Sequence, residues 1–247
     1  MNKIISPFLS LFLVFSFFVS PVPQTVSAQT ATQTQASADL ENRLAKIEEK
    51  IEARRKELGI PGMSLAIVKD GNVILSKGYG YKSFEKKVPV TADSQFAIGS
   101  ASKAFTALSV LMSADEGKLS LEENPRKYLS YFKINDAETN EKIKVRNLLT
   151  HSSGLNRTDL GWITGKLTRE EIIKVAGEAK PVAKLGEKFL YQNVMFAAAG
   201  EIVSEVQNMT WENYVAQKIF KPLGMLNSNL SVPEMQKAKD YSLGYEY

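Results

Sequence analysis

The sequence predicts a mixed α/β (α+β) fold, in which an antiparallel sheet is flanked by helices and an all-helical domain is inserted. Two observations predict this fold class. An amphipathic helix pattern and two adjacent strand patterns come first, and helix patterns then dominate from about residue 100 to residue 220. A two-stranded hairpin is at best marginally stable by itself, so the sheet needs further strands. None is evident after residue 230, so we expect the later strands to be missing and residues 39–247 to form an incomplete domain.

The first element is a helix predicted from Asp39 to about Leu58. Asp39 is a favourable N-cap residue, and Gly59 is suited to end the helix. Apolar residues recur there at helical spacing, with Glu and Lys on the opposite face: Leu40, Leu44, Ile47 and Ile51. This pattern is typical of an amphipathic helix with one buried face.

Two strands are predicted next, at residues 63–69 and 72–77. The dipeptide Asp70-Gly71 between them is a strong signal for a tight hairpin turn. Gly78 and Gly80 are expected to loosen the chain after the second strand.

In the helical region, a loop with a short helix is predicted over residues 118–132, and five further helices are predicted. The first begins at Ser100, is apolar nearly all round, and ends at Gly117, so we expect it to be buried. A short helix covers residues 145–150, and a capping box, Thr168 to Glu171, opens a helix that reaches about Ala179. The last two cover residues 193–206 and 210–220. No internal repeat is present.

The first residues have the pattern of an export signal. Lys3 supplies a positive charge, residues 4–19 are apolar, and Val26-Ser27-Ala28 has the small residues of a cleavage site. We therefore expect residues 1–28 to be a signal peptide, residues 29–38 to be a flexible lead-in, and the mature protein to be periplasmic or secreted. The alternative is an uncleaved anchor on a membrane-attached structural protein, but the apolar run is short for a spanning helix. Contact with a membrane is expected only through this segment, if it stays uncleaved.

Composition excludes several classes of function. The formal net charge is +4, and no basic run is interleaved with aromatic residues, so nucleic acid is not an expected partner. The absence of cysteine excludes disulfides and thiol catalysis. The one histidine, His151, lies in an expected turn and is predicted to have a structural role. Because zinc sites use several His or Cys ligands, we expect no metal, and no cofactor is implied.

The segment Ser100-Ala101-Ser102-Lys103 is the strongest candidate for chemistry. Residues three apart on a helix share a face, so the Lys103 amine can lie beside the Ser100 hydroxyl. Serine is a weak nucleophile near neutral pH until a neighbouring base activates it. The S-x-x-K spacing provides both groups in one turn and is a recognised signature of penicillin-interacting serine enzymes. The alternative is an N-cap serine followed by a solvated lysine.

A second candidate, Tyr191-Gln192-Asn193, precedes the Ala-rich helix. Side chains two residues apart on extended backbone point the same way, so Tyr191 and Asn193 can face one site. The alternative is a buried core tyrosine followed by an asparagine helix cap.

Several segments together resemble the serine β-lactamase-like family, in the branch that contains class C β-lactamases, D-alanyl-D-alanine carboxypeptidases and related esterases. The resemblance extends from about residue 39 to residue 230 and depends on segments that occur in this order: Ile60–Met63, Phe96–Lys103, Asn147–Leu155, Tyr191–Asn193 and Lys221–Met225. Each segment alone is common, but the ordered combination is specific.

The resemblance implies a serine hydrolase that forms an acyl-enzyme with a small-molecule or peptide substrate, namely a β-lactam, a D-Ala peptide or an ester. It implies that Ser100 is the nucleophile, that Lys103 helps to deprotonate it, and that Tyr191 is a general base. Asn193 is implied to bind the substrate amide or to orient Lys103. The backbone N–H of Ser100 would form half of an oxyanion hole.

The sequence departs from the family pattern in one respect. Family members carry a third motif, Lys-Thr-Gly or His-x-Gly, on a later strand, and no copy follows Tyr191. That strand would supply the second oxyanion donor, and loss of one donor costs about 3 kcal/mol. A tyrosine is ordinarily protonated at neutral pH, so Tyr191 needs two nearby cations to act as a base. The alternative function is therefore a truncated, catalytically deficient relative that binds a peptide or a partner.

Overall fold

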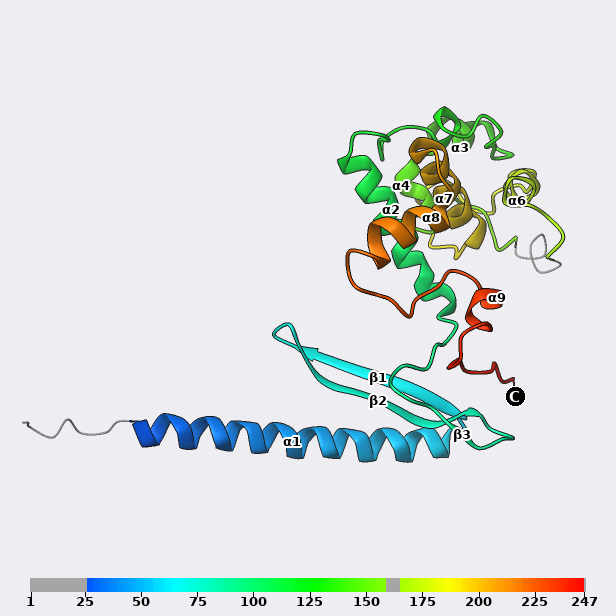
Figure 1. The fold of residues 1–247 in the computed structure, drawn as a ribbon. Helices are drawn as coiled ribbons and strands as arrows, with labels where there is room; N and C mark the ends of the chain where they lie inside the picture. Colours follow the sequence, from blue (N-terminus) through cyan, green and yellow to red (C-terminus); the bar gives the residue numbers. More distant parts are fainter. Residues whose placement is uncertain (1–25, 159–164, 247) are drawn as a thin grey trace, which may run out of the picture. The chain divides into compact units, whose positions relative to one another are not determined.

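The computed structural model describes residues 26–158 and 165–246 (Figure 1). The predicted signal peptide, residues 1–28, lies almost wholly outside this part of the chain. The structure separates into two compact units, Met1–Gly59 and Ile60–Tyr247. Within the residues described, no helix is both long and apolar enough to cross a membrane.

The first unit contains one long helix, α1, which covers Val26–Glu57. The prediction that this helix begins at Asp39 and follows a flexible lead-in at 29–38 was wrong, because α1 includes those residues. Neither glycine nor proline occurs between Val26 and Glu57, so no residue there strongly opposes helix formation. Asp39, which was predicted to be the N-cap, therefore lies inside the helix.

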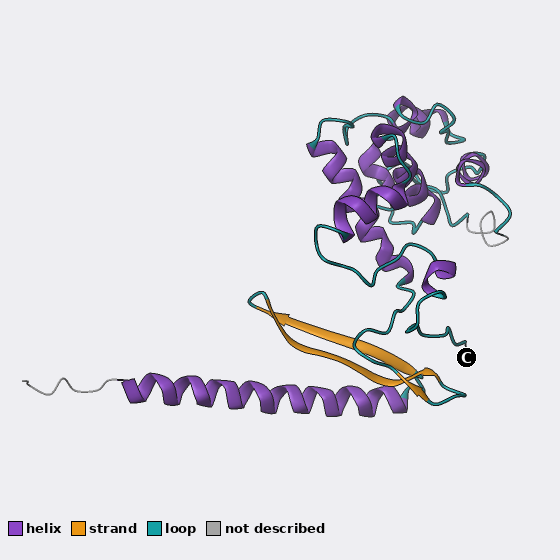
Figure 2. Ribbon diagram, in the orientation of Figure 1, coloured by secondary structure: helices purple, strands orange, loops and turns teal. Residues whose placement is uncertain are grey.

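The second unit begins with a three-stranded antiparallel sheet in the order β1-β2-β3 (Figure 2). Its strands are β1 (Gly62–Lys69), β2 (Asn72–Ser83) and β3 (Val88–Pro89). The predicted hairpin is confirmed, because Lys69 pairs with Asn72. Asp70 and Gly71 between them have positive φ values of 51° and 76°, as a tight two-residue turn requires.

The expected loosening at Gly78 and Gly80 was wrong, because β2 continues through both to Ser83. Gly78 instead permits a close approach of the backbone. A Cβ atom at this position would lie 2.4 Å from the carbonyl oxygen of Val90, nearer than a real side chain allows. The missing side chain therefore lets the segment after β3 pass directly beside β2.

The remainder of the second unit is mainly helical. Its helices are α2 (Ser102–Asp115), α3 (Ala137–Lys142), α4 (Val145–Leu148), α6 (Arg169–Gly177), α7 (Asn193–Gln207), α8 (Trp211–Val215) and α9 (Val232–Met235). The predicted capping box is present at the start of α6, where the Thr168 side chain accepts from the backbone of Glu171 and the Glu171 side chain accepts in return. A π-helical turn, Ala216–Phe220, continues α8 and matches the predicted helix over 210–220.

The core lies among these helices, and α7 is its central element. Nine residues of α7 are buried, and the helix packs against α2, α6 and α8. The prediction that α2 is buried all round was wrong. Val110 is fully buried, but Leu108 and Leu111 are 40% and 45% exposed, because nothing in the described part of the chain covers that face.

The C-terminal segment returns to the sheet after α9. The amide of Gln95 donates to the carbonyl of Asp240, and the amide of Leu243 donates to the carbonyl of Lys82. The Asp240 carboxylate accepts from Lys82 Nζ at 2.6 Å and from the hydroxyls of Thr91 and Ser94. Burial opposes ionisation of Asp240, but these three hydrogen bonds outweigh it and lower its pKa to about 2. No strand follows α9 within residues 236–246, as the sequence had indicated.

Candidate active site

Ser100 and Lys103 lie at the beginning of α2. Ser100 is part of a 3₁₀ turn, Gly99–Ala101, and α2 itself starts at Ser102. The turn begins at Gly99, which has a φ of 52° that glycine adopts without strain. The Lys103 Nζ donates to Ser100 Oγ at 3.1 Å, so the S-x-x-K spacing does bring the two groups together.

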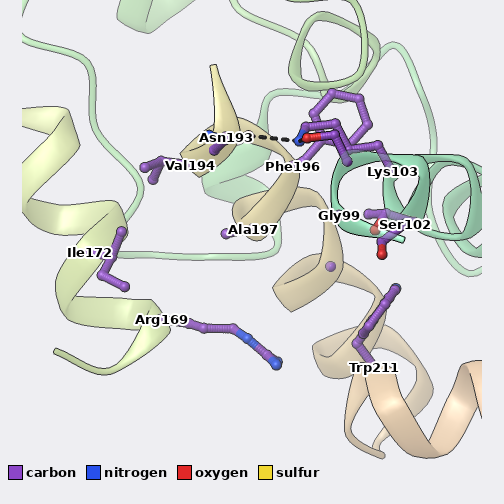
Figure 3. A pocket seen from close by; sticks show the side chains of 13 residues that line it. Gly99, Ser102, Lys103, Arg169, Ile172, Asn193, Val194, Phe196, Ala197 and Trp211 are labelled. Carbon is purple, nitrogen blue, oxygen red and sulfur yellow. Dashed lines mark hydrogen bonds between the residues drawn. The ribbon is translucent and has the colours of Figure 1, made fainter. Parts of the chain in front are cut away.

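Tyr191 and Asn193 contact the same pair of residues from the start of α7. The hydroxyl of Tyr191 donates to Ser100 Oγ at 2.6 Å. The Oδ1 atom of Asn193 accepts from Lys103 Nζ at 2.6 Å (Figure 3). All four predicted site residues are therefore linked by hydrogen bonds, although 88 or more positions separate the two pairs in the chain.

Gln192, between these two residues, is directed into the protein and holds the segment in place. It is fully buried, and its side chain accepts from the amide of Val194 at the start of α7. Its Nε2 donates to the carbonyl of Asn156 at 2.7 Å. The alternation expected for extended backbone thus places Tyr191 and Asn193 on the site and Gln192 behind it. Sequence reasoning did not identify Gln192 as a supporting residue.

The electrostatic surroundings favour ionisation of Tyr191. Hydrogen bonding to Lys103 and to Ser100 lowers the pKa of the phenol, and the charges of Lys103 and Arg157 add to this effect. Lys103 Nζ lies 4.8 Å from the centroid of the Tyr191 ring, and Arg157 Cζ lies 5.7 Å from it. These are the two nearby cations that the sequence argument required. Arg157 was not predicted, because only the folded chain brings it near Tyr191.

His151 packs behind Tyr191. It is 8% exposed, and its ring stacks on the Tyr191 ring at 4.4 Å between centroids and 28° between planes. Its Nδ1 accepts from the backbone N–H of Gln192 at 3.0 Å. Burial lowers the pKa of His151, and the charge of Lys103 lowers it further, so the neutral ring is favoured. These contacts fit the predicted structural role and connect it to the position of Tyr191.

A cavity of about 440 Å³ opens beside Ser100 and Lys103. Its walls come from the turn Gly99–Ala101, from α2, α6 and α7, and from the first residue of α8 (Figure 3). In that view Ile172 and Arg169 of α6 lie across from Gly99 and Ser102, with Ala197 of α7 between them. The residues described contain no group of three or more His, Cys, Asp and Glu that could hold a metal ion.

Comparison with known protein families gives a match over most of the chain. The family model described as Beta-lactamase matches residues 47–246, which is most of the chain.

The chain belongs to the beta-lactamase family.

The proteins that this chain resembles include penicillin-binding protein homologues. Protein flp of Staphylococcus aureus (strain N315) is 34% identical over 190 residues, which cover 76% of this chain and 38% of that protein. The chain thus spans 38% of the length of this curated relative. Among solved structures, the octameric penicillin-binding protein homologue from Pyrococcus abyssi is 36% identical with a TM-score of 0.74, covering 82% of this chain and 48% of that one. A class C beta lactamase is 25% identical with a TM-score of 0.71, covering 84% and 56%.

These similarities confirm the predicted family and the predicted mixed α/β fold. The mixed α/β structure described above, with its small antiparallel sheet and its helices, matches the class C beta lactamase structure over 84% of this chain. The matched range 47–246 includes the Ser100, Lys103, Tyr191 and Asn193 positions.

Proposed function

We propose that this member of the beta-lactamase family is a serine hydrolase that forms an acyl-enzyme on Ser100. The single observation that carries the proposal is the convergence on Ser100 Oγ, which accepts from Tyr191 at 2.6 Å and from Lys103 at 3.1 Å. A hydroxyl within hydrogen-bond reach of two groups that can exchange protons is the arrangement that nucleophilic catalysis needs.

In the proposed reaction, Tyr191 in its ionised form removes the proton from Ser100 Oγ. The oxygen attacks the carbonyl carbon of the substrate, an O–C bond forms, and the bond to the leaving group breaks. The proton passes from Tyr191 to the leaving group. Water then attacks the acyl-enzyme and gives its proton to Tyr191. The bond between Ser100 Oγ and the acyl carbon breaks, the acid product leaves, and Tyr191 returns the proton to Ser100 Oγ, which restores both groups.

Lys103 serves this cycle by its charge and its hydrogen bonds. Its ammonium group lies near the Tyr191 ring and favours the phenolate. Asn193 fixes the same ammonium group at 2.6 Å, so the cation keeps its position while the proton moves. Arg157, which is exposed, supplies a second positive charge, and water screens it.

Three classes of substrate remain open for this site: β-lactams, D-Ala peptides and esters. The similarity to a penicillin-binding protein homologue and to a class C beta lactamase supports a substrate from one of these classes. The second candidate function is a binding module without turnover.

Labelling of Ser100 tests the proposal. The protein is incubated with a fluorescent penicillin and, separately, with a fluorophosphonate, and the adduct is located by mass spectrometry. We expect a covalent adduct on Ser100 and none in Ser100→Ala. Ser102→Ala is the matched control, because it removes a neighbouring hydroxyl of the same segment and should keep the label. Folded protein that takes neither label, or equal labelling of Ser100→Ala, would contradict the proposal and favour the binding module.

A further inference from the structure

The cavity beside Ser100 has an apolar interior that the proposed reaction does not use. Apart from Gly99, six of its lining residues are apolar or aromatic or lack a side chain: Ile172, Val194, Phe196, Ala197, Gly200 and Trp211. They come from three helices, α6, α7 and α8, while Gly99, Ser100 and Lys103 line the same cavity from the other side. A chain bound along these residues would therefore have one end beside the nucleophile.

The charged and indole groups around the cavity already have partners. Arg169 forms ion pairs with Glu201 and Glu212. Trp211 donates its indole N–H to Ser109 Oγ at 3.2 Å, and Lys103 donates to Asn193. The charge of Arg169 is balanced by two carboxylates, and a hydrocarbon needs no polar partner among the apolar residues. The lining thus favours an uncharged, apolar occupant.

The size of the cavity fits a small-molecule substituent. Its volume of about 440 Å³ lies within the range of roughly 300–1,000 Å³ that is usual for ligand sites. Gly200 contributes to this space, since a Cβ there would come to 3.5 Å from the Trp211 ring. Larger residues at Ala197 or Gly200 would reduce the volume available.

We propose that this cavity binds the acyl group of the substrate, and that the preferred substrates are carboxylic esters with a medium-length, unbranched hydrocarbon acyl chain. This inference rests on the proposed function, because the acyl carbonyl must reach Ser100 Oγ. The ester's C–O bond breaks as the bond to Ser100 forms, the alcohol leaves with the proton, and water later releases the carboxylic acid. The hydrocarbon chain stays among the apolar residues of α6, α7 and α8 during both steps.

A series of p-nitrophenyl esters measures this preference. Acetate, butanoate and octanoate esters share a leaving group and differ only in chain length. Each methylene buried in an apolar site changes kcat/KM by about fourfold, so burial of two or three gives a preference of about 15- to 60-fold for octanoate over acetate. Initial rates are taken at concentrations below those at which octanoate esters aggregate.

A variant that fills the cavity tests its location. Ala197→Leu places a larger side chain among the lining residues. The helix propensity of Leu is nearly as high as that of Ala, so the change should not disturb α7 itself. We expect the preference for octanoate to fall to within about threefold of acetate. Ala66→Leu is the control, because it makes the same change at an exposed position of β1 outside the cavity and should keep the preference.

A protection measurement on the unaltered protein guards against misfolding of the variant. Sodium octanoate should slow the labelling of Ser100 by fluorophosphonate at concentrations where sodium acetate has no effect. Equal turnover of acetate and octanoate esters, a preference that survives in folded Ala197→Leu, or no protection by octanoate would each overturn the inference while labelling of Ser100 still supported the proposed function. Absence of any label on Ser100 would remove both together.

Discussion

Replacing His151 by Phe should destabilise the segment that holds Tyr191. Phe keeps an aromatic ring for the stack at 4.4 Å, but it removes the Nδ1 atom that accepts from the Gln192 amide. Gln192 is fully buried, so that amide would have no water to replace the lost acceptor. His151→Asn is the informative comparison, because its side-chain oxygen can accept from the amide and Asn tolerates the φ of 56°.

The magnitude follows from the cost of an unsatisfied buried donor. That cost is about 1–3 kcal/mol, so His151→Phe should lower the free energy of unfolding by about 2 kcal/mol at pH 8. His151→Asn keeps the hydrogen bond but loses ring contacts with Tyr191, Phe189 and Phe196. Aromatic pairs contribute about 0.5–1.5 kcal/mol each, so this variant is also less stable, for a different reason.

The pH dependence of the free energy of unfolding distinguishes His151 from an apolar side chain at the same position. The pKa of His151 is lowered in the folded protein, chiefly by burial. As the pH falls below about 6.5, the ordinary value, the unfolded chain binds a proton that the folded chain does not, so the wild-type protein loses stability. Neither variant has this loss, so the difference between wild type and His151→Phe should shrink from pH 8 to pH 5.

Urea denaturation at several pH values, followed by circular dichroism, measures these free energies. Because the sequence contains one histidine, its imidazole proton signal in an NMR titration reports the pKa of His151 directly. Equal stability of wild type and His151→Phe at pH 8 would refute the role of Nδ1. An imidazole that titrates at or above its ordinary value would refute the argument from burial.

Two further predictions concern the framework around the site. Asp240→Asn should lower stability by about 1–2 kcal/mol at pH 7, because it removes the charge that Lys82 contacts at 2.6 Å. With a folded pKa of about 2, below the ordinary 3.8, Asp240 contributes stability above pH 3.8 that is lost as the pH falls towards 2, and the variant should lack this loss in acid denaturation. Gly154→Ala should cost more than about 2 kcal/mol, because φ is 80° and the new Cβ would lie 2.2 Å from the carbonyl oxygen of Ala183. Gly186→Ala, with a φ of 79° and nothing within 4 Å, should cost about 1 kcal/mol, and equal melting temperatures for the two variants would contradict the close-approach argument.

Local chemistry made several elements of this protein predictable. The Asp70-Gly71 turn, the capping box at Thr168 and the S-x-x-K turn at Ser100 depend on residues close together in the chain, so spacing alone located them. The same reasoning failed for α1, where no residue marks the point at which a helical pattern begins.

The extent of burial on α2 could not be predicted in this way. Its apolar residues lie on all faces, but periodicity does not say which faces other parts of the chain cover. Leu108 and Leu111 remain partly exposed, although the sequence suggested a fully buried helix. Gly78 shows the same limit, because its role depends on the approach of Val90 and not on its neighbours in the strand.

The sequence by itself determined the candidate chemistry, since the identities and short spacings of Ser100 with Lys103 and of Tyr191 with Asn193 are local properties of the chain. Only the tertiary structure decided that these two pairs meet, that Arg157 and His151 stand beside the phenol, and that an apolar cavity adjoins the serine. The physical reason is that a pKa and a cavity depend on distances between atoms that are far apart in the chain. Those distances are set by the packing of α7 against its neighbouring helices and not by local spacing.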